Sequence, residues 1–172
     1  MKKRLVGLTA VGSAALVLIG LSVTGLPGAA AEGNQTLHFQ EQATNVTYVP
    51  VQTLINSHQS GNQGDYVVFE DPLVNDKQQV VGYNEGECFT TNPTTGTSEC
   101  PGVTFVFTGV HGFPKGTIQG AGIFIGPPDG SQGPANADPF LYGTGAFTGA
   151  QGTLTGRQLS FTLDDWTLSY SR

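Results

Sequence analysis

The sequence predicts an all-β protein with a single domain, an eight-stranded antiparallel closed β-barrel. No amphipathic helical stretch of useful length follows Ala31, and glycine and proline occur 25 and 10 times in 172 residues. β-Branched and aromatic residues cluster in short runs between them, which is typical of a meander or barrel of short strands. Eight antiparallel strands can close around side chains or one small ligand. An open sandwich is the alternative architecture.

The predicted strands are joined by turns rich in glycine, proline and asparagine. They span residues 36–49, 65–71, 79–88, 103–110, 117–125, 140–147, 151–155 and 158–170. Closure of the barrel would leave no exposed sheet edge. Glycines inside the strands, such as Gly120 and Gly143, suit the tight bends of a small barrel. The segment 126–138 is predicted to be a long loop that forms a rim or lid.

The first 31 residues are predicted to be a signal-peptide helix that is removed on export. Positive charges at positions 2–4 precede an uncharged apolar run to about Leu26, and Ala29 and Ala31 provide the A-x-A cleavage pattern. We therefore expect cleavage after Ala31, a secreted extracellular location, and one domain over residues 32–172. An uncleaved membrane anchor is the alternative, because the apolar run is just long enough to span a bilayer.

Removal of the signal would leave an acidic domain. The chain has seven basic and thirteen acidic residues, and three of the basic ones but none of the acidic ones precede residue 32. The remaining domain has four basic residues, thirteen acidic residues and a net charge of −9. It lacks the basic patch of a protein that binds nucleic acid or anionic lipid. We expect no nucleic-acid partner and no stable membrane insertion after cleavage.

Cys88 and Cys100 are the two cysteines of the chain. In an exported protein they are expected to form a disulfide, closing the polar segment 89–99 as a hairpin loop. Such a short bridge stabilises a fold by about 2–3 kcal/mol. A pair of free thiols is the alternative. A metal site is disfavoured because neither cysteine has a histidine or another cysteine at ligand spacing, and no metal or cofactor is expected.

Three segments resemble the allene oxide cyclase barrel, the family shared with plant dirigent proteins. Residues 64–73 (GDYVVFEDPL) are similar to a strand that leaves into a turn, and residues 81–88 (VGYNEGEC) to the family's G-x-x-x-G-x-C strand. The strongest likeness is residues 141–152 (LYGTGAFTGAQG), which resemble the GGTGxFxxAxG corner with Tyr142 in place of the first glycine. The resemblance implies an eight-stranded antiparallel barrel with a largely apolar cavity, in dimers or trimers.

The resemblance also implies a kind of chemistry. Plant members of the family cyclise an unstable fatty-acid epoxide or steer the coupling of phenoxy radicals, and bacterial relatives close rings in polyketides. In such reactions the barrel orients a reactive substrate, and orientation alone can lower a barrier by several kcal/mol. We therefore expect a secreted barrel that binds a small hydrophobic molecule, polyketide- or lipid-like, as a cyclase or isomerase. A non-catalytic ligand carrier or cell-envelope interaction module is the alternative.

Aromatic side chains are the candidates for a ligand cavity, since such pockets are mostly apolar with a few polar groups. The candidates are Tyr83, Phe105, Phe107, Phe124, Tyr142 and Trp166. In the last predicted strand, a one-residue bulge at Asp164-Asp165 would bring Trp166 onto the face of Leu159, Phe161 and Leu163. The alternative is that these aromatic residues fill the barrel core. An enclosed cavity above about 300 Å³ would favour ligand binding.

Acidic residues within the predicted strands are the candidate catalytic groups. If Glu70 or Glu85 pointed into the barrel, burial would raise its pKa and make it a general acid or base. The alternative is that both lie on the solvent side of the wall. The sequence contains no Ser/His/Asp signature, phosphate-binding loop or zinc-ligand spacing. The three histidines, His38, His58 and His111, lie far apart and are predicted to be surface or structural residues.

Overall fold

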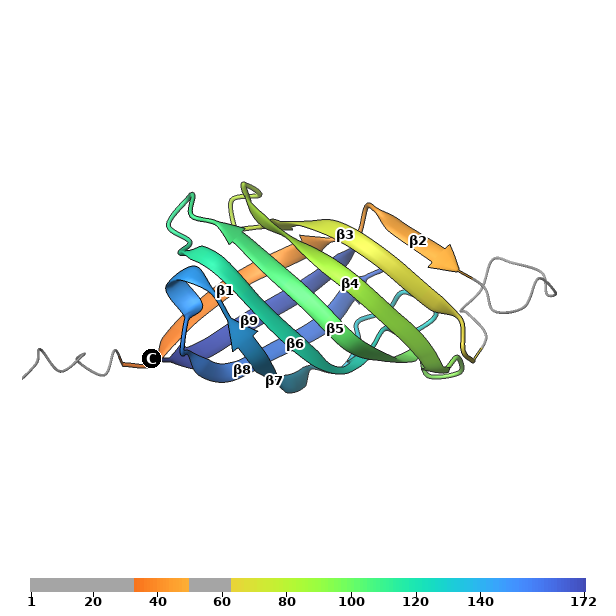
Figure 1. Ribbon diagram of the computed structural model, residues 1–172. Coiled ribbons are helices and arrows are strands. Elements are labelled where there is room, and N and C mark those ends of the chain that lie inside the picture. Colours follow the sequence, from red (N-terminus) through yellow and green to blue (C-terminus); the bar gives the residue numbers. More distant parts are fainter. Residues whose placement is uncertain (1–32, 50–62) are drawn as a thin grey trace, which may run out of the picture. The chain divides into compact units, whose positions relative to one another are not determined.

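The computed structural model describes residues 33–49 and 63–172 of the chain. Within these residues one antiparallel sheet runs in the order β1-β9-β8-β7-β6-β5-β4-β3-β2, and pairing of β1 with β3 closes it (Figure 1). The strands are β1 (Gln35–Gln42), β2 (Val46–Val49), β3 (Tyr66–Val74), β4 (Val80–Asn92), β5 (Thr97–Thr108), β6 (Lys115–Ile125), β7 (Asn136–Gly143), β8 (Gln151–Ser160) and β9 (Leu163–Ser171). The closed ring has eight of these strands, because β2 pairs only with β3. The predicted fold class is confirmed.

The predicted first strand, 36–49, is two strands. The chain leaves β1 after Gln42 and resumes as β2 at Val46. At the break, one carboxylate oxygen of Asp71 accepts hydrogen bonds from the backbone N–H groups of Thr44 and Asn45, both at 2.7 Å. These bonds replace the strand hydrogen bonds that the break removes. β1 can therefore end at the closing pair with β3, while β2 continues the pairing farther along β3.

The last hairpin differs from the prediction, which placed its turn at residues 156–157. The turn lies instead at residues 161–162, between β8 and β9. Gly156 is within β8 and pairs with Trp166, and a Cβ at this position would collide with the Trp166 indole ring. The glycine therefore serves close packing of the indole against the strand rather than a turn.

The expected bulge at Asp164-Asp165 is absent. Pairing of β1 with β9 is continuous from Gln35–Tyr170 to Gln42–Leu163, and the irregularity of the β8–β9 hairpin lies in β8 between Gln158 and Ser160. Phe161 is at the hairpin tip and 67% exposed, so it does not share an inner face with Trp166. With no bulge, strand periodicity places Asp164 on the same inner face as Trp166.

The remaining differences concern strand ends. β4 and β5 extend beyond the cysteines, so the turn between them is only residues 93–96, and Cys88 and Cys100 form the expected disulfide. β7 begins at Asn136 rather than at residue 140, and residues 145–147 form a short 3-10 turn instead of strand. The predicted loop after β6 is therefore residues 126–135.

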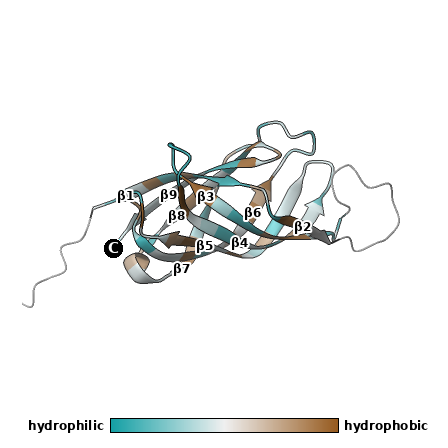
Figure 2. Cartoon of the chain, turned by 90° about the horizontal axis from the view of Figure 1, so that it is seen from above, coloured by the Kyte–Doolittle hydropathy of each residue, from teal (hydrophilic) through white to brown (hydrophobic). Residues whose placement is uncertain are grey.

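Aromatic side chains fill one end of the barrel. Phe39 lies at the centre of this aromatic cluster. The centroid of its ring is 5.2 Å from that of Phe107, 5.8 Å from that of Phe105 and 6.4 Å from that of Phe113. Phe147, from the 3-10 turn, packs 5.5 Å from Phe107 and is fully buried. Figure 2 shows hydrophobic and hydrophilic residues interleaved along the strands, as expected where alternate side chains face the core and the solvent.

The signal-peptide prediction for residues 1–31 lies outside the described residues, as does His58. Within residues 33–49 and 63–172, no helix has the length and apolar character needed to cross a membrane.

Candidate functional site

The other part of the barrel interior holds a cavity of about 270 Å³. Its wall is mostly apolar and includes Val67, Phe69, Val103, Phe105, Phe124, Leu154, Trp166 and the disulfide cysteines. The cavity opens to the surface, since the lining residues Val46 and Ile123 are 48% and 53% exposed. Its volume is slightly below the range of about 300–1,000 Å³ that is common for ligand sites. It therefore suits a small molecule.

Three of the six predicted cavity residues lie in this wall. Trp166 from β9 contacts Phe105 from β5 and Phe124 from β6, with ring centroids 5.0 Å and 6.0 Å away. Phe107 is buried but belongs to the filled end of the barrel, beside Phe113. One end of the interior is therefore a packed aromatic core and the other part is a cavity, so each of the two alternatives describes part of the barrel.

The placement of Tyr83 and Tyr142 in the cavity is wrong. Tyr83 is 37% exposed and precedes Asn84, which is buried, so strand alternation turns the tyrosine outward. Tyr142 is 61% exposed and its neighbour Leu141 67% exposed, because the β6–β7 pairing is irregular at Gly120. Neither tyrosine lines the cavity.

Glu70 and Glu85 also lie outside the barrel. The two residues are direct partners in the β3–β4 pairing, and both are exposed. Their neighbours Asp71 and Asn84 are buried and line the cavity, so alternation directs both glutamates to solvent. Neither meets the condition for a general acid or base in the cavity, and the alternative of a solvent-facing wall describes them.

The carboxyl groups in the cavity are Glu41, Asp71 and Asp164, together with Asp138 at its edge. Strand pairing arranges the first three in a polar belt around the wall. Asp164 in β9 is the direct partner of Glu41 in β1, and Asp71 in β3 is the direct partner of Asn84 in β4. Glu41 and Asp71 are 4% and 1% exposed. A largely apolar cavity thus contains several buried acids.

Glu41 is held by two donors. Its Oε2 accepts hydrogen bonds from Asn84 Nδ2 at 2.7 Å and from the indole Nε1 of Trp166 at 2.9 Å. Burial and the negative charge of Asp164 raise the pKa of Glu41 to about 8, although the hydrogen bond from Asn84 opposes this rise. At neutral pH Glu41 therefore carries a proton, and Oε1 is the oxygen left to hold it.

Asp164 is the second group that titrates near neutral pH. Burial and the negative charge of Asp71 raise the pKa of Asp164 to about 7. Because Asp164 and Glu41 are neighbours across the β1–β9 pairing, their protonation states are coupled and belong to the pair. Two adjacent carboxyls with pKa values near neutrality can supply one general acid and one general base.

Two further polar groups shape the site. Asn84 is 1% exposed, and its Oδ1 has no hydrogen-bond partner among the residues that the structure describes. Asp138 lies against Gly122, where a Cβ would collide with its carboxyl group, and burial raises its pKa. No group of histidine, cysteine and acidic side chains within the described part of the chain is arranged to hold a metal ion.

The strand pattern contained a signal for these buried acids. Glu41 follows Leu37 and Phe39 at the spacing of two that places residues on one face, and Asp164 precedes Trp166 at the same spacing. The bulge assumed at Asp164-Asp165 removed that signal for Asp164. Glu41 was not among the candidate acids, and an acidic residue on an inner face is an exception to the usual exposure of acids.

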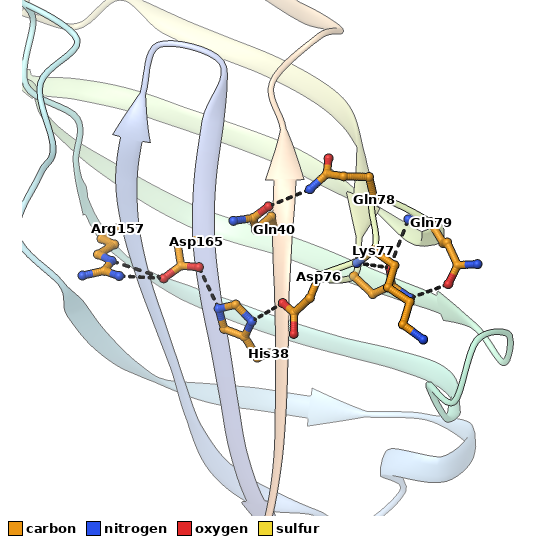
Figure 3. A network of polar contacts seen from close by, with 9 residues as sticks. His38, Gln40, Asp76, Lys77, Gln78, Gln79, Arg157 and Asp165 are labelled. Atoms are coloured by element: carbon orange, nitrogen blue, oxygen red, sulfur yellow. Dashed lines mark hydrogen bonds and ion pairs between the residues drawn. The ribbon is translucent and has the colours of Figure 1, made fainter.

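A separate network of charges lies on the outer face of β1, β8 and β9 (Figure 3). His38 Nε2 lies 2.7 Å from Asp165 Oδ1, and Nδ1 lies 2.9 Å from Asp76 in the turn after β3. Arg157 donates to the other oxygen of Asp165 at 3.1 Å and 3.2 Å. Partial burial lowers the pKa of His38, but the hydrogen bonds and charges of Asp165 and Asp76 outweigh it and raise the pKa above 6.5.

Comparison with known proteins identifies the fold. No protein-family model matches the chain, and no curated protein does either. Among solved structures, a pterocarpan synthase dirigent protein is 18% identical with a TM-score of 0.66, covering 83% of this chain and 92% of its own. The chain has the dirigent fold. The resemblance expected from the sequence is confirmed at that level.

Enzymes of other kinds share this dirigent-type barrel. Pyocyanin demethylase is 21% identical with a TM-score of 0.58, covering 79% of this chain and 99% of its own. A Diels–Alderase from Streptomyces koyangensis is 15% identical with a TM-score of 0.55, covering 84% of this chain and 70% of its own. At such identities the likeness establishes the fold alone, and the activity has to be argued from the cavity.

Proposed function

We propose that this protein is a secreted, substrate-positioning barrel that promotes the cyclisation or isomerisation of a small, largely apolar molecule. The observation that carries the proposal is the pair of Glu41 and Asp164, adjacent across two strands in the wall of an otherwise apolar cavity. Burial raises the pKa of both carboxyls toward neutrality. Such a pair can donate and accept protons without an external cofactor.

The chemistry assigned to the pair is a proton transfer within a held substrate. Glu41 donates its proton to a basic oxygen or nitrogen of the substrate, and Asp164 removes a proton from another atom of the same molecule. The electron pair released at the second atom forms the new π or σ bond. The substrate thus gains one proton and loses one, so that the product has the same composition. A proton exchange between the carboxyls then restores both groups.

The aromatic wall contributes orientation. Trp166, Phe105 and Phe124 form one continuous ring surface, and the Trp166 indole N–H is bound to Glu41. A flat or folded apolar molecule packed against these rings is therefore held next to the acidic pair. Holding reactive groups in this way can lower a barrier by several kcal/mol.

Proteins that share the fold support this class of activity without fixing the reaction. Solved dirigent-type barrels include a pterocarpan synthase dirigent protein and a Diels–Alderase, but also a demethylase. One fold can carry unrelated reactions. The acidic pair in this chain favours proton-assisted isomerisation among them.

Native mass spectrometry of the protein collected from the culture medium provides the test. We expect a small molecule to accompany the protein, and a dimer or trimer as the assembly. After the ligand is extracted and incubated with fresh protein, the product should keep its mass but change its chromatographic retention. Glu41→Gln and Asp164→Asn should slow this conversion by about 100-fold or more, while Glu70→Gln on the outer wall should not.

Two results would contradict the proposal in different ways. If the protein carries a ligand that it never converts, and the variants bind it equally well, the barrel is a carrier. If no small molecule binds the cavity at all, the barrel acts through its outer surface, as an interaction module would.

A further inference from the structure

Each side-chain nitrogen atom in the described part of the cavity wall already donates a hydrogen bond to the protein. The side chains with N–H groups in the wall are those of Asn84, Asn136, Gln158 and Trp166. Asn84 and Trp166 both donate to Glu41. Gln158 donates to the carbonyl oxygens of Pro127 and Ser131, and Asn136 to that of Ile123. Each of these nitrogen atoms thus already donates to the protein, and of the four only the amides of Asn84 and Asn136 keep a second N–H.

Acceptors, by contrast, remain open. Asn84 is 1% exposed and lines the cavity, and no described residue donates a hydrogen bond to its Oδ1. Both hydrogen bonds to Glu41 fall on Oε2. Oε1 therefore accepts a hydrogen bond from a ligand only when Glu41 is ionised. Leaving a buried acceptor without a donor is unfavourable. A ligand that donates a hydrogen bond to Asn84 Oδ1 would satisfy this acceptor.

The charges of the wall have one sign. Among the described residues, no lysine, arginine or histidine lines the cavity, whereas four acidic residues do: Glu41, Asp71, Asp138 and Asp164. An anionic ligand would lie among these carboxyls without a counter-charge, whereas a cation would be attracted to them. The faces of Trp166 and the neighbouring phenylalanine rings add a further attraction for a cation.

We propose that the ligand is a hydrophobic amine or a protonated nitrogen heterocycle, bound with its N–H groups toward Asp164 and Asn84, and that carboxylates are rejected. This inference rests on the proposed function, since it names the class of substrate for the same cavity. A ligand of this class differs from a fatty acid, whose carboxylate the cavity would repel. An ammonium group beside the pair of Glu41 and Asp164 also favours ionisation of Asp164, the more acidic of the two. Binding near neutral pH therefore releases a proton from Asp164, while Glu41 keeps the proton that the proposed transfer needs.

Trp166 gives a direct measurement, because it is the single tryptophan of the chain and lines the cavity. The probes are 4-phenylbutylamine, 4-phenylbutan-1-ol and 4-phenylbutyrate, which share a phenyl ring and a similar chain but differ in charge. The phenyl ring does not absorb at the red edge of the indole band, so each probe can be titrated by Trp166 fluorescence. We expect the amine to bind at least about tenfold more tightly than the carboxylate, with the alcohol between them.

Variants separate the cavity from general surface charge. Asp164→Asn should reduce the preference for the amine, whereas Glu85→Gln removes an equal charge from the outer wall and should leave the preference unchanged. High salt should also leave it largely intact, because buried charges are screened much less than exposed ones. Calorimetry of amine binding in two buffers of different ionisation enthalpy should reveal the released proton.

The outcomes distinguish the two proposals. If the carboxylate binds as tightly as the amine, or more tightly, this inference is overturned while the ligand-binding cavity remains. If none of the three probes changes Trp166 fluorescence, this inference fails, and mass spectrometry of the collected protein decides separately whether the cavity binds a ligand. If Glu85→Gln reduces the preference as much as Asp164→Asn does, the attraction is that of an acidic surface, and this inference again fails.

Discussion

Asp164 and Asp165 are consecutive residues of β9, yet their carboxyls lie on opposite faces of the barrel wall. Asp164 lines the cavity beside its strand partner Glu41. Asp165 points outward and binds His38 and Arg157 at 2.7 Å and 3.1 Å (Figure 3). The same residue type thus has two roles that differ only by strand alternation: an acid in an apolar cavity, and a member of a charged network in solvent.

The buried acids should make the protein less stable as the pH rises. Glu41 and Asp164 have raised pKa values in the folded state, about 8 and about 7 against 4.5 and 3.8. Between those limits the folded protein keeps protons that the unfolded chain has lost, so raising the pH favours unfolding. The loss should amount to several kcal/mol, since a pKa difference of one corresponds to about 1.4 kcal/mol and the pKa of each carboxyl differs by about three. Urea unfolding from about pH 5 to 8 measures it.

Glu41→Gln should flatten this dependence, because the amide oxygen still accepts from Asn84 and Trp166 but no longer ionises. Glu85→Gln, an exposed control, should keep the slope of the wild type. Stability that stays constant or rises over this pH range would contradict the protonated cavity.

The outer network around His38 should also contribute less to stability as the pH rises, and the change should be small. Because the pKa of His38 is raised above 6.5, its contribution to stability is complete below that pH and is lost as the pH rises through the higher folded value. The His38 side chain is 43% exposed, so we expect less than about 1 kcal/mol. NMR titration of the His38 ring should show the raised pKa, and Asp165→Asn should lower it. A wild-type value below 6.5 would refute the network.

The disulfide should stabilise the cavity wall. Cys88 and Cys100 are 12 residues apart, lie on neighbouring strands and line the cavity. Replacing both with serine should lower the free energy of unfolding by about 3 kcal/mol, as measured by urea unfolding. Reduction of the wild type should have a comparable effect. If the oxidised wild type and the double variant unfold at the same urea concentration, the bridge contributes nothing.

Gly156 should be required for the position of the Trp166 indole. A Cβ at Gly156 would overlap the indole ring, so Gly156→Ala should displace it and destabilise the fold by about 1–3 kcal/mol. The displaced ring should also show shifted fluorescence and weaker ligand binding. Gly102→Ala is the matched control, since a Cβ there has nothing within 4 Å. Equal behaviour of the two variants would argue against this packing role.

The sequence contains local signals, such as turn residues, but not the pairing between distant strands. Turn residues and short β-branched runs report strand number, so the closed eight-stranded barrel and the Cys88–Cys100 bridge were predictable. Strand ends and bulges depend on pairing between strands, which a single sequence does not contain. Gly156 resembles a turn residue until the indole that it accommodates is known, and the misplaced turn led to the false bulge at Asp164-Asp165.

The candidate site was predicted only in its apolar half for the same reason. Phe105, Phe124 and Trp166 lie in the cavity wall, and hydrophobicity alone suggested them. Tyr83 and Glu85 belong to the outward set of β4, which the buried Asn84 between them defines. A buried asparagine or carboxyl is the exception to average behaviour, so its position becomes evident only when the strand register is fixed.

The most direct test of the acidic pair is a carbon-13 NMR titration of the Glu and Asp carboxyl groups. Spectra of Glu41→Gln and Asp164→Asn assign the two signals. The account predicts that the pair titrates with apparent pKa values near 8 and 7. If both carboxyls are instead fully ionised by about pH 5.5, as ordinary exposed acids are, the cavity holds two fixed negative charges and the proposed proton transfer is wrong.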